Sequence, residues 1–171
     1  MNGYSTTRIA RPRHVLQIRG TPVLAVMIGS MLASALPIIA QVPLLPPFGL
    51  MIFVAWRLIR ADIWPLWIGL PLGLFDDIMS GQPLGSAVLL WTLILLGLDL
   101  EHQRNFWRDY WHDWLIGGLS IAFALLGGWL FVHLSGNGGS VVQILPQIAY
   151  SIGLLPLIVR ICAALDRWRL P

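Results

Sequence analysis

The stretch Gly69-Leu-Pro-Leu-Gly-Leu-Phe-Asp-Asp-Ile-Met-Ser-Gly-Gln-Pro-Leu-Gly85 places two adjacent carboxylates, Asp76 and Asp77, inside an apolar run that is otherwise uncharged. On a helix, every fourth residue lies on one face, and here that face reads Gly69, Gly73, Asp77, Gly81 and Gly85. Rows of small residues let the backbones of two membrane helices approach closely. The stretch therefore predicts a helix that packs tightly against its neighbour, with one acid in the contact.

The rest of the chain is strongly apolar. Of its 171 residues 57% are hydrophobic and 11% are charged, and the mean hydropathy is +0.74. These values are typical of a membrane protein and not of a soluble domain. We expect an all-α, polytopic bundle of about six transmembrane helices, over residues 21–42, 44–56, 63–79, 84–98, 115–134 and 141–165. Span 44–56 is short for a full crossing, and we expect it to be tilted, bent or only half-inserted.

Three further segments lie outside these spans. Residues 1–20 form a basic arm in which Pro12 and Gly20 disfavour a long helix, and residues 166–171 form a short tail. Between the fourth and fifth spans, segment 99–114 places Trp107, Tyr110, Trp111 and Trp114 on one helical face. This pattern predicts an amphipathic helix that lies in the membrane interface.

All 11 basic residues are arginines, and they lie in the N-terminal arm, the 57–62 loop, the 99–113 loop and the C-terminal end, which here includes Arg160 near the end of span 141–165. The intervening loops contain none. Under the positive-inside rule, this alternation predicts a multi-pass protein of the bacterial inner membrane with both termini in the cytoplasm. It also places the Asp pair near the outer face. No dense basic patch with interleaved aromatic residues is present in the sequence, so nucleic acid is not an expected partner.

Asp77 is expected one turn before the end of its helix, where the helix dipole disfavours a negative charge. Pro83 is suited to the first position of the next helix, which brings the free amides of Leu84 and Gly85 close to that end. We hypothesise that Asp77 clamps the two helices into a hairpin. In this hypothesis Gly81 and Gly85 remove side chains that would block the contact.

Other polar side chains at the outer ends of the spans could line a solute pocket or simply meet the interface: Asp76, Gln82, His133, Gln143 and Gln147. Adjacent residues on a helix point roughly 100° apart, so the two aspartates do not readily form a shared acid–base dyad. Four loop residues match no recurring metal-ligand spacing, namely His102, Asp109, His112 and Asp113. We therefore expect no catalytic residue, no metal and no cofactor.

The string Asp77-Ile-Met-Ser-Gly-Gln-Pro-Leu-Gly85, preceded by Gly73-Leu-Phe, resembles the most recognisable segment of the rod shape-determining MreD family. In that family an Asp, a Gly four residues later and a Pro-Leu-Gly or similar turn join two central spans. Asp77 matches this pattern, whereas Asp76 stands where an apolar residue is usual. The resemblance implies a fold similar to the S-components of energy-coupling-factor (ECF) vitamin transporters. A solute-binding transporter subunit therefore remains the alternative function.

The resemblance further implies a non-catalytic component of the bacterial elongation machinery that builds lateral-wall peptidoglycan. The implied direct partner is an MreC-type membrane protein with a single span. The wider complex contains the cytoskeletal protein MreB, a glycan polymerase of the shape, elongation, division and sporulation (SEDS) family, and a penicillin-binding transpeptidase.

Overall fold

The computed structural model describes residues 12–35, 45–60, 62–104, 110–137 and 139–169. These residues contain six α-helices and no strand, which confirms the all-α prediction for the described chain. The α-helices are α1 Pro12–Ala35, α2 Phe48–Ile59, α3 Gly69–Ser80, α4 Ser86–Arg104, α5 Tyr110–Val132 and α6 Leu145–Arg169. Three short helical segments, η1 Leu66–Ile68, η2 His133–Asn137 and η3 Val141–Gln143, adjoin them.

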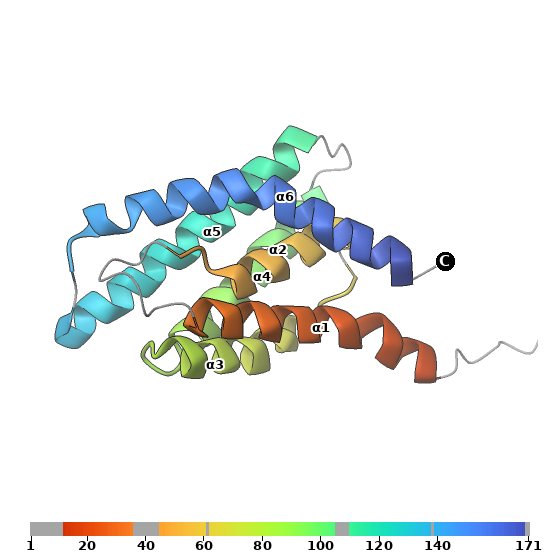
Figure 1. Ribbon diagram of the computed structural model, residues 1–171, viewed down its shortest axis with the longest axis horizontal. Helices are drawn as coiled ribbons and strands as arrows, with labels where there is room; N and C mark the ends of the chain where they lie inside the picture. The colour runs from red at the N-terminus through yellow and green to blue at the C-terminus, as the bar shows by residue number, and fades with distance from the viewer. Residues whose placement is uncertain (1–11, 36–44, 61, 105–109, 138, 170–171) are drawn as a thin grey trace, which may run out of the picture.

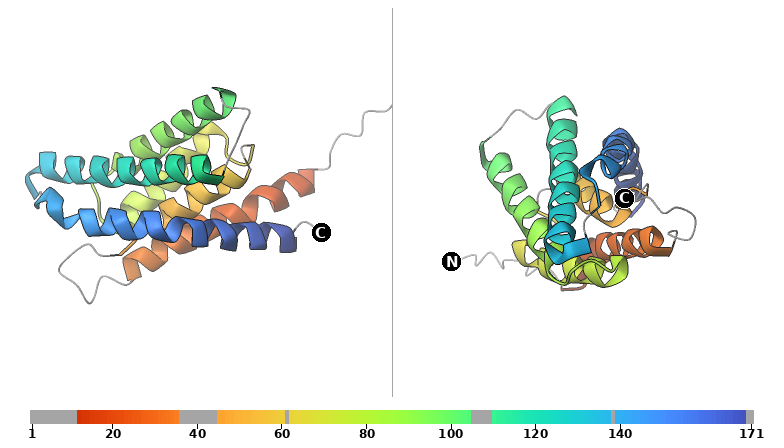
Figure 2. Two further views of the ribbon diagram at one scale, coloured as in Figure 1. Left: turned by 90° about the horizontal axis from the view of Figure 1, so that it is seen from above. Right: turned by 90° about the vertical axis from the view of Figure 1, so that its left-hand side faces the viewer.

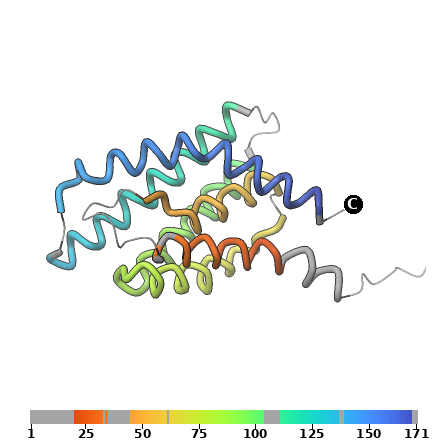
Figure 3. The backbone as a smooth tube through the Cα atoms, viewed as in Figure 1, coloured from red at the N-terminus to blue at the C-terminus, as the bar shows by residue number. Residues whose placement is uncertain are grey.

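The helices form a bundle in which α1 begins and α6 ends at the same end (Figure 1, Figure 3). We call this the arginine end, because Arg57 and Arg60 at the end of α2 contact acids of α4 and α6 there. The opposite end holds the turn between α3 and α4, and we call it the motif end (Figure 2). Short connections join helices that run in opposite directions, as the hairpin prediction requires.

The central helix is α2, which contacts α1, α5 and α6. Its residues from Gly49 to Arg57 are buried apart from Ile52, so other helices shield it from the surroundings. With 12 residues, α2 is about 18 Å long, whereas the hydrocarbon core of a bilayer is about 30 Å thick. A helix of this length does not cross a bilayer alone.

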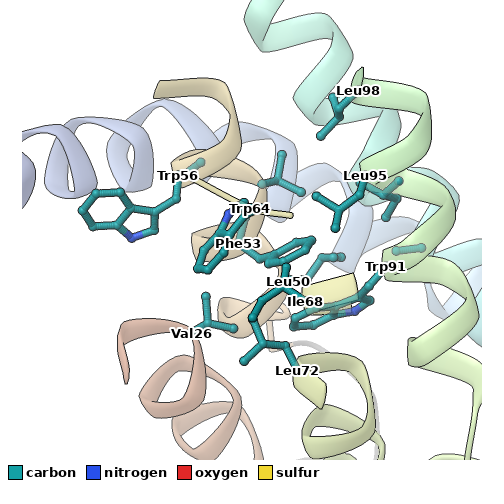
Figure 4. Packing of buried hydrophobic residues seen from close by; sticks show 14 of the residues in the cluster. Val26, Leu50, Phe53, Trp56, Trp64, Ile68, Leu72, Trp91, Leu95 and Leu98 are labelled. Atoms are coloured by element: carbon teal, nitrogen blue, oxygen red, sulfur yellow. The ribbon is translucent and has the colours of Figure 1, made fainter. Parts of the chain in front are cut away.

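Aromatic rings fill the core between α2, α3 and α4 (Figure 4). The ring of Phe53 lies 5.4 Å from that of Trp64 and 4.7 Å from that of Trp91, measured between centroids. The buried indole of Trp64 donates a hydrogen bond to the Phe53 carbonyl at 3.1 Å. This bond satisfies the polar atom of a residue that otherwise contributes only apolar area. The core therefore fixes where the chain enters α3.

Two expectations about secondary structure differ from the structure. Helix α1 begins at Pro12, so residues 12–20 are helical, although Pro12 and Gly20 were expected to disfavour a long helix. Proline is favoured at the first position of a helix because it has no N–H to leave unpaired. The predicted interfacial helix over 99–114 is not a single element either. Its residues 99–104 continue α4, residues 110–114 begin α5, and residues 105–109 lie outside the described residues.

Two described segments are long and apolar enough to cross a membrane by length and composition. They are Trp111–Gly136, whose most apolar 18 residues have a mean hydropathy of 2.1, and Val141–Trp168, whose most apolar 18 residues have a mean hydropathy of 2.0. In their most apolar parts only 28% and 17% of the residues are buried, whereas the core helix of a soluble protein is mostly buried. The two segments thus indicate association with a membrane.

Candidate functional site

Asp77 accepts three hydrogen bonds, although the residue is only 1% exposed. Its Oδ1 accepts hydrogen bonds from the Ala87 amide at 2.9 Å and from the Ser86 hydroxyl at 2.8 Å. Its Oδ2 accepts a hydrogen bond from the Gly85 amide at 2.7 Å. All three donors lie where α4 begins, so the free amides and the positive end of the helix dipole both favour the carboxylate. Asp77 therefore caps the helix that follows its own.

The contact between Asp77 and the start of the next helix lies where the hairpin hypothesis expects it, but its donors differ in part. The Gly85 amide donates as expected, whereas Ala87 takes the place expected for Leu84. The reason is that α4 begins at Ser86 and not at Pro83. Pro83 instead precedes the helix, and its carbonyl accepts a hydrogen bond from the Ser86 amide at 3.1 Å.

Gly69 and Gly73 let the backbones of α3 and α4 touch. A Cβ atom on Gly73 would lie 2.7 Å from both the N and the Cα of Val88. A Cβ atom on Gly69 would lie 2.9 Å from Oγ1 and 3.2 Å from the N of Thr92. Val88 and Thr92 are one turn apart, so the two glycines follow one line along α4. These two members of the predicted row have the close-packing role that the sequence suggested.

Gly81 and Gly85 have a different role, and the expectation that they remove blocking side chains is wrong. A Cβ atom on either glycine would meet nothing within 4 Å. Both have positive φ, of 69° and 97°, and L-residues with a side chain pay about 1–2 kcal/mol for that conformation. The first ends α3, and the second turns the chain so that its amide points at Asp77. They are required by the turn and not by the packing.

The other polar residues predicted at the outer face are spread over the motif end. Gln147 donates to the Leu45 carbonyl at 2.6 Å, and the imidazole of His133 stacks on Trp129 with centroids 5.0 Å apart. Gln82 lies 3.4 Å from the Ser86 hydroxyl, and Gln143 is exposed in η3. No hydrogen bond joins any two of Asp76, Gln82, His133, Gln143 and Gln147 in the described part of the chain.

The ion pairs at the arginine end were not predicted. The guanidinium of Arg57, 6% exposed, binds the carboxylate of Asp99 on α4. Arg60 lies 3.7 Å from Asp166 of α6, and Glu101 lies 3.1 Å from His112 of α5. The pairs tie the ends of α2, α4 and α6 and the start of α5 together. The sequence did contain a signal for these pairs, because the alternation of arginines between loops already predicts that these segments lie at the same face of the membrane.

None of the described side chains forms a group of three or more potential metal ligands. Of the four loop residues considered for a metal, Asp109 lies outside the described residues. His112 contacts Glu101, as noted above, and no metal-binding arrangement forms around it.

A proline in α6 is compensated by a tryptophan of α5. Pro156 has no N–H, so the carbonyl of Ile152 one turn earlier lacks its usual helical partner. The Trp114 indole donates to this carbonyl at 3.2 Å. Both rings also line a cavity of about 160 Å³ between α2, α5 and α6. The proline thus leaves a carbonyl on α6 through which a hydrogen bond links this helix to α5.

Comparisons of the chain with models of known families, with curated proteins and with solved structures find no match.

Proposed function

We propose that this chain is a non-catalytic, multi-pass protein of the bacterial inner membrane that acts in the cell-elongation machinery and binds an MreC-type partner. The observation that carries the proposal is the Asp77 clamp. The string from Asp77 to Gly85 carries the resemblance to the MreD family, and in it each of the principal residues has a defined task. Asp77 caps α4, Gly81 and Gly85 make the turn, and none of them is left over for chemistry.

Membrane insertion of the whole bundle is supported by its apolar surface. Large apolar side chains are more than 40% exposed on five of the six helices, including Leu24, Leu74, Leu93, Leu119 and Leu157. Soluble monomers rarely expose contiguous apolar patches beyond a few hundred Å². A lipid environment removes the cost of exposing these side chains. The exception is α2, which is surrounded by the other helices.

The proposed orientation places the arginine end in the cytoplasm and the motif end outside. Single cysteines introduced by Leu84→Cys and Asp62→Cys test it, because both native side chains are exposed at opposite ends. The native Cys162 is 4% exposed, so it gives little background labelling. In intact cells a membrane-impermeant maleimide should label Leu84→Cys alone. Labelling of Asp62→Cys alone would reverse the orientation.

The function itself is tested by co-purification from native membranes together with depletion in a rod-shaped cell. We expect an MreC-type protein with one span to co-purify, and we expect depleted cells to become round. Wild-type protein and the control Asp62→Asn should restore rods, whereas Asp77→Ala should not. Recovery of a vitamin-like solute and an ATPase module, without an MreC-type protein, would instead identify a transporter subunit.

A further inference from the structure

The cavity between α2, α5 and α6 lies near the arginine end, where α2 ends and α5 begins. Its volume is about 160 Å³, and its lining consists of Leu58, Ile59, Asp113, Trp114, Leu155, Pro156 and Val159. Each of the three helices contacts the other two. An apolar cavity of about 150 Å³ is large enough for a benzene molecule, so this cavity has room for a hydrocarbon segment of roughly six carbon atoms.

A glycine of α5 shapes the inner end of the cavity. A Cβ atom on Gly117 would lie 2.7 Å from Cδ2 of Leu155 and 3.0 Å from Cδ1 of Leu58. These two leucines therefore pack onto the backbone of α5, one turn further into the bundle than Asp113. Their contact with Gly117 closes the cavity on this side.

Water is a poor occupant of this cavity. The indole N–H of Trp114 is already donated to the Ile152 carbonyl at 3.2 Å, and Pro156 has no N–H to offer. Among the described residues of the lining, Asp113 is the single one with a charged side chain. A buried water typically makes about three hydrogen bonds, which one carboxylate does not supply. The lining therefore favours an apolar occupant.

The surroundings of the cavity are apolar as well. It lies beside α5 and α6, the two helices that indicate association with a membrane, and their outward side chains Leu119, Leu157 and Ile161 are more than 50% exposed. Apart from Leu155, the lining residues are half-buried, so the cavity is open to these surroundings. Asp113, in the first turn of α5 where the helix dipole favours an acid, gives the opening a polar rim.

We propose that this cavity binds an acyl chain of a membrane lipid from the leaflet at the arginine end. The chain fills the apolar part between Leu58, Leu155 and Val159, and the polar headgroup stays on the side of Asp113. Binding restores the dispersion contacts that the lining of an empty cavity loses. The inference rests on the proposed membrane insertion and not on the proposed partner.

Photocrosslinking of the purified full chain in lipid nanodiscs tests this proposal. The probe is a phosphatidylcholine with a diazirine in the upper part of one acyl chain, because the cavity lies near the end of the bundle. It is added at a low level to unlabelled phosphatidylcholine, and mass spectrometry locates the cross-linked residues after irradiation. We expect cross-links to Leu58 and Ile59 of α2, a helix that the other helices surround, besides those to the outward-facing Ile161 of α6.

Two substitutions of one lining residue and a matched control show whether the chain reaches α2 through the cavity. Val159→Trp should fill the cavity and abolish the cross-links to α2, while those to Ile161 remain. Val159→Met, a smaller enlargement, should weaken the α2 cross-links and serves if the larger side chain prevents folding. The control Leu157→Trp adds bulk on the outward face of the same helix and should keep the α2 cross-links.

The outcomes separate the lipid site from membrane insertion. Cross-links to Ile161 without any to α2 would overturn the lipid site and leave membrane insertion intact. Cross-links to α2 that persist unchanged in both Val159 variants would overturn the site as well, because the chain would then reach α2 by another route. A lack of cross-links to both α2 and α6 would refute membrane insertion together with the site.

Discussion

The Asp77 clamp gives the most direct test of how the α3–α4 hairpin is held. The substitution Asp77→Ala removes the acceptor of three hydrogen bonds in a site that is 1% exposed. The Ser86 hydroxyl can rotate to another partner. The amides of Gly85 and Ala87 cannot, because the backbone fixes their direction. We therefore expect a loss of stability that comes mainly from these two amides.

The size of the loss follows from two limits. Hydrogen bonds between membrane helices contribute about 0.6 kcal/mol each on average, so three bonds give a lower limit of about 2 kcal/mol. A buried donor left without a partner costs about 1–3 kcal/mol, so the two amides give an upper limit of about 6 kcal/mol. For a chain of this length even the lower limit lowers the melting temperature by about 4 °C or more.

The assay is thermal unfolding in nanodiscs, together with the amount of protein that accumulates in the membrane. Asp77→Asn should be intermediate, because one amide oxygen can still accept from Ser86 and Ala87 while its NH2 group faces the Gly85 amide. Asp62→Ala, at an exposed site, serves as the control. If Asp77→Ala melts at the wild-type temperature, or if Asp77→Asn melts at a lower temperature than Asp77→Ala, hydrogen bonds to Asp77 do not hold the hairpin together.

Three further predictions use the same unfolding assay. Gly73→Ala should destabilise the protein strongly because its Cβ would meet backbone atoms of α4. The control Gly153→Ala on α6 should be neutral or slightly stabilising because its Cβ would meet nothing within 4 Å. Equal effects of the two substitutions would contradict close packing at Gly73. Trp114→Phe should cost about 1 kcal/mol by leaving a carbonyl unpaired, and adding Pro156→Ala, which restores the helical donor, should remove most of that cost; additive effects would exclude the link. Arg57→Ala should lower the melting temperature because it leaves Asp99 without its partner. Replacing both Arg57 and Asp99 by Leu should recover much of this loss. If the double substitution recovers nothing, the ion pair itself stabilises the fold.

The hairpin could be predicted from the sequence because its parts are close together in the chain. The spacing of Gly69, Gly73 and Asp77 places them on one face of any helix, and only a short turn follows before the next apolar run. Two consecutive helices joined in this way have to be neighbours. The choice of Asp77 over Asp76 also follows, because only Asp77 shares the face with the glycines.

The role of Gly81 and Gly85 could not be predicted from spacing alone. A glycine that makes room for a neighbour and a glycine that adopts a positive φ look the same in a sequence. The backbone conformation separates them: the space beside both residues is open, and their φ angles are 69° and 97°. Because of this turn, α4 begins at Ser86 and not at Pro83. The backbone amides that meet Asp77 therefore lie a few residues later than the position of Pro83 suggested.

The sequence by itself determined that the chain is helical and apolar, that its arginines alternate between loops, and that one acid lies on a glycine-lined face. Only the tertiary structure decided that α2 is central, that Arg57 meets Asp99, and that Ser30 of α1 packs against Gly49 of α2. The physical reason is that nearly every face of these helices is apolar. Hydrophobic periodicity then does not indicate which face points inward, so packing against distant helices fixes the rotation of each helix about its axis.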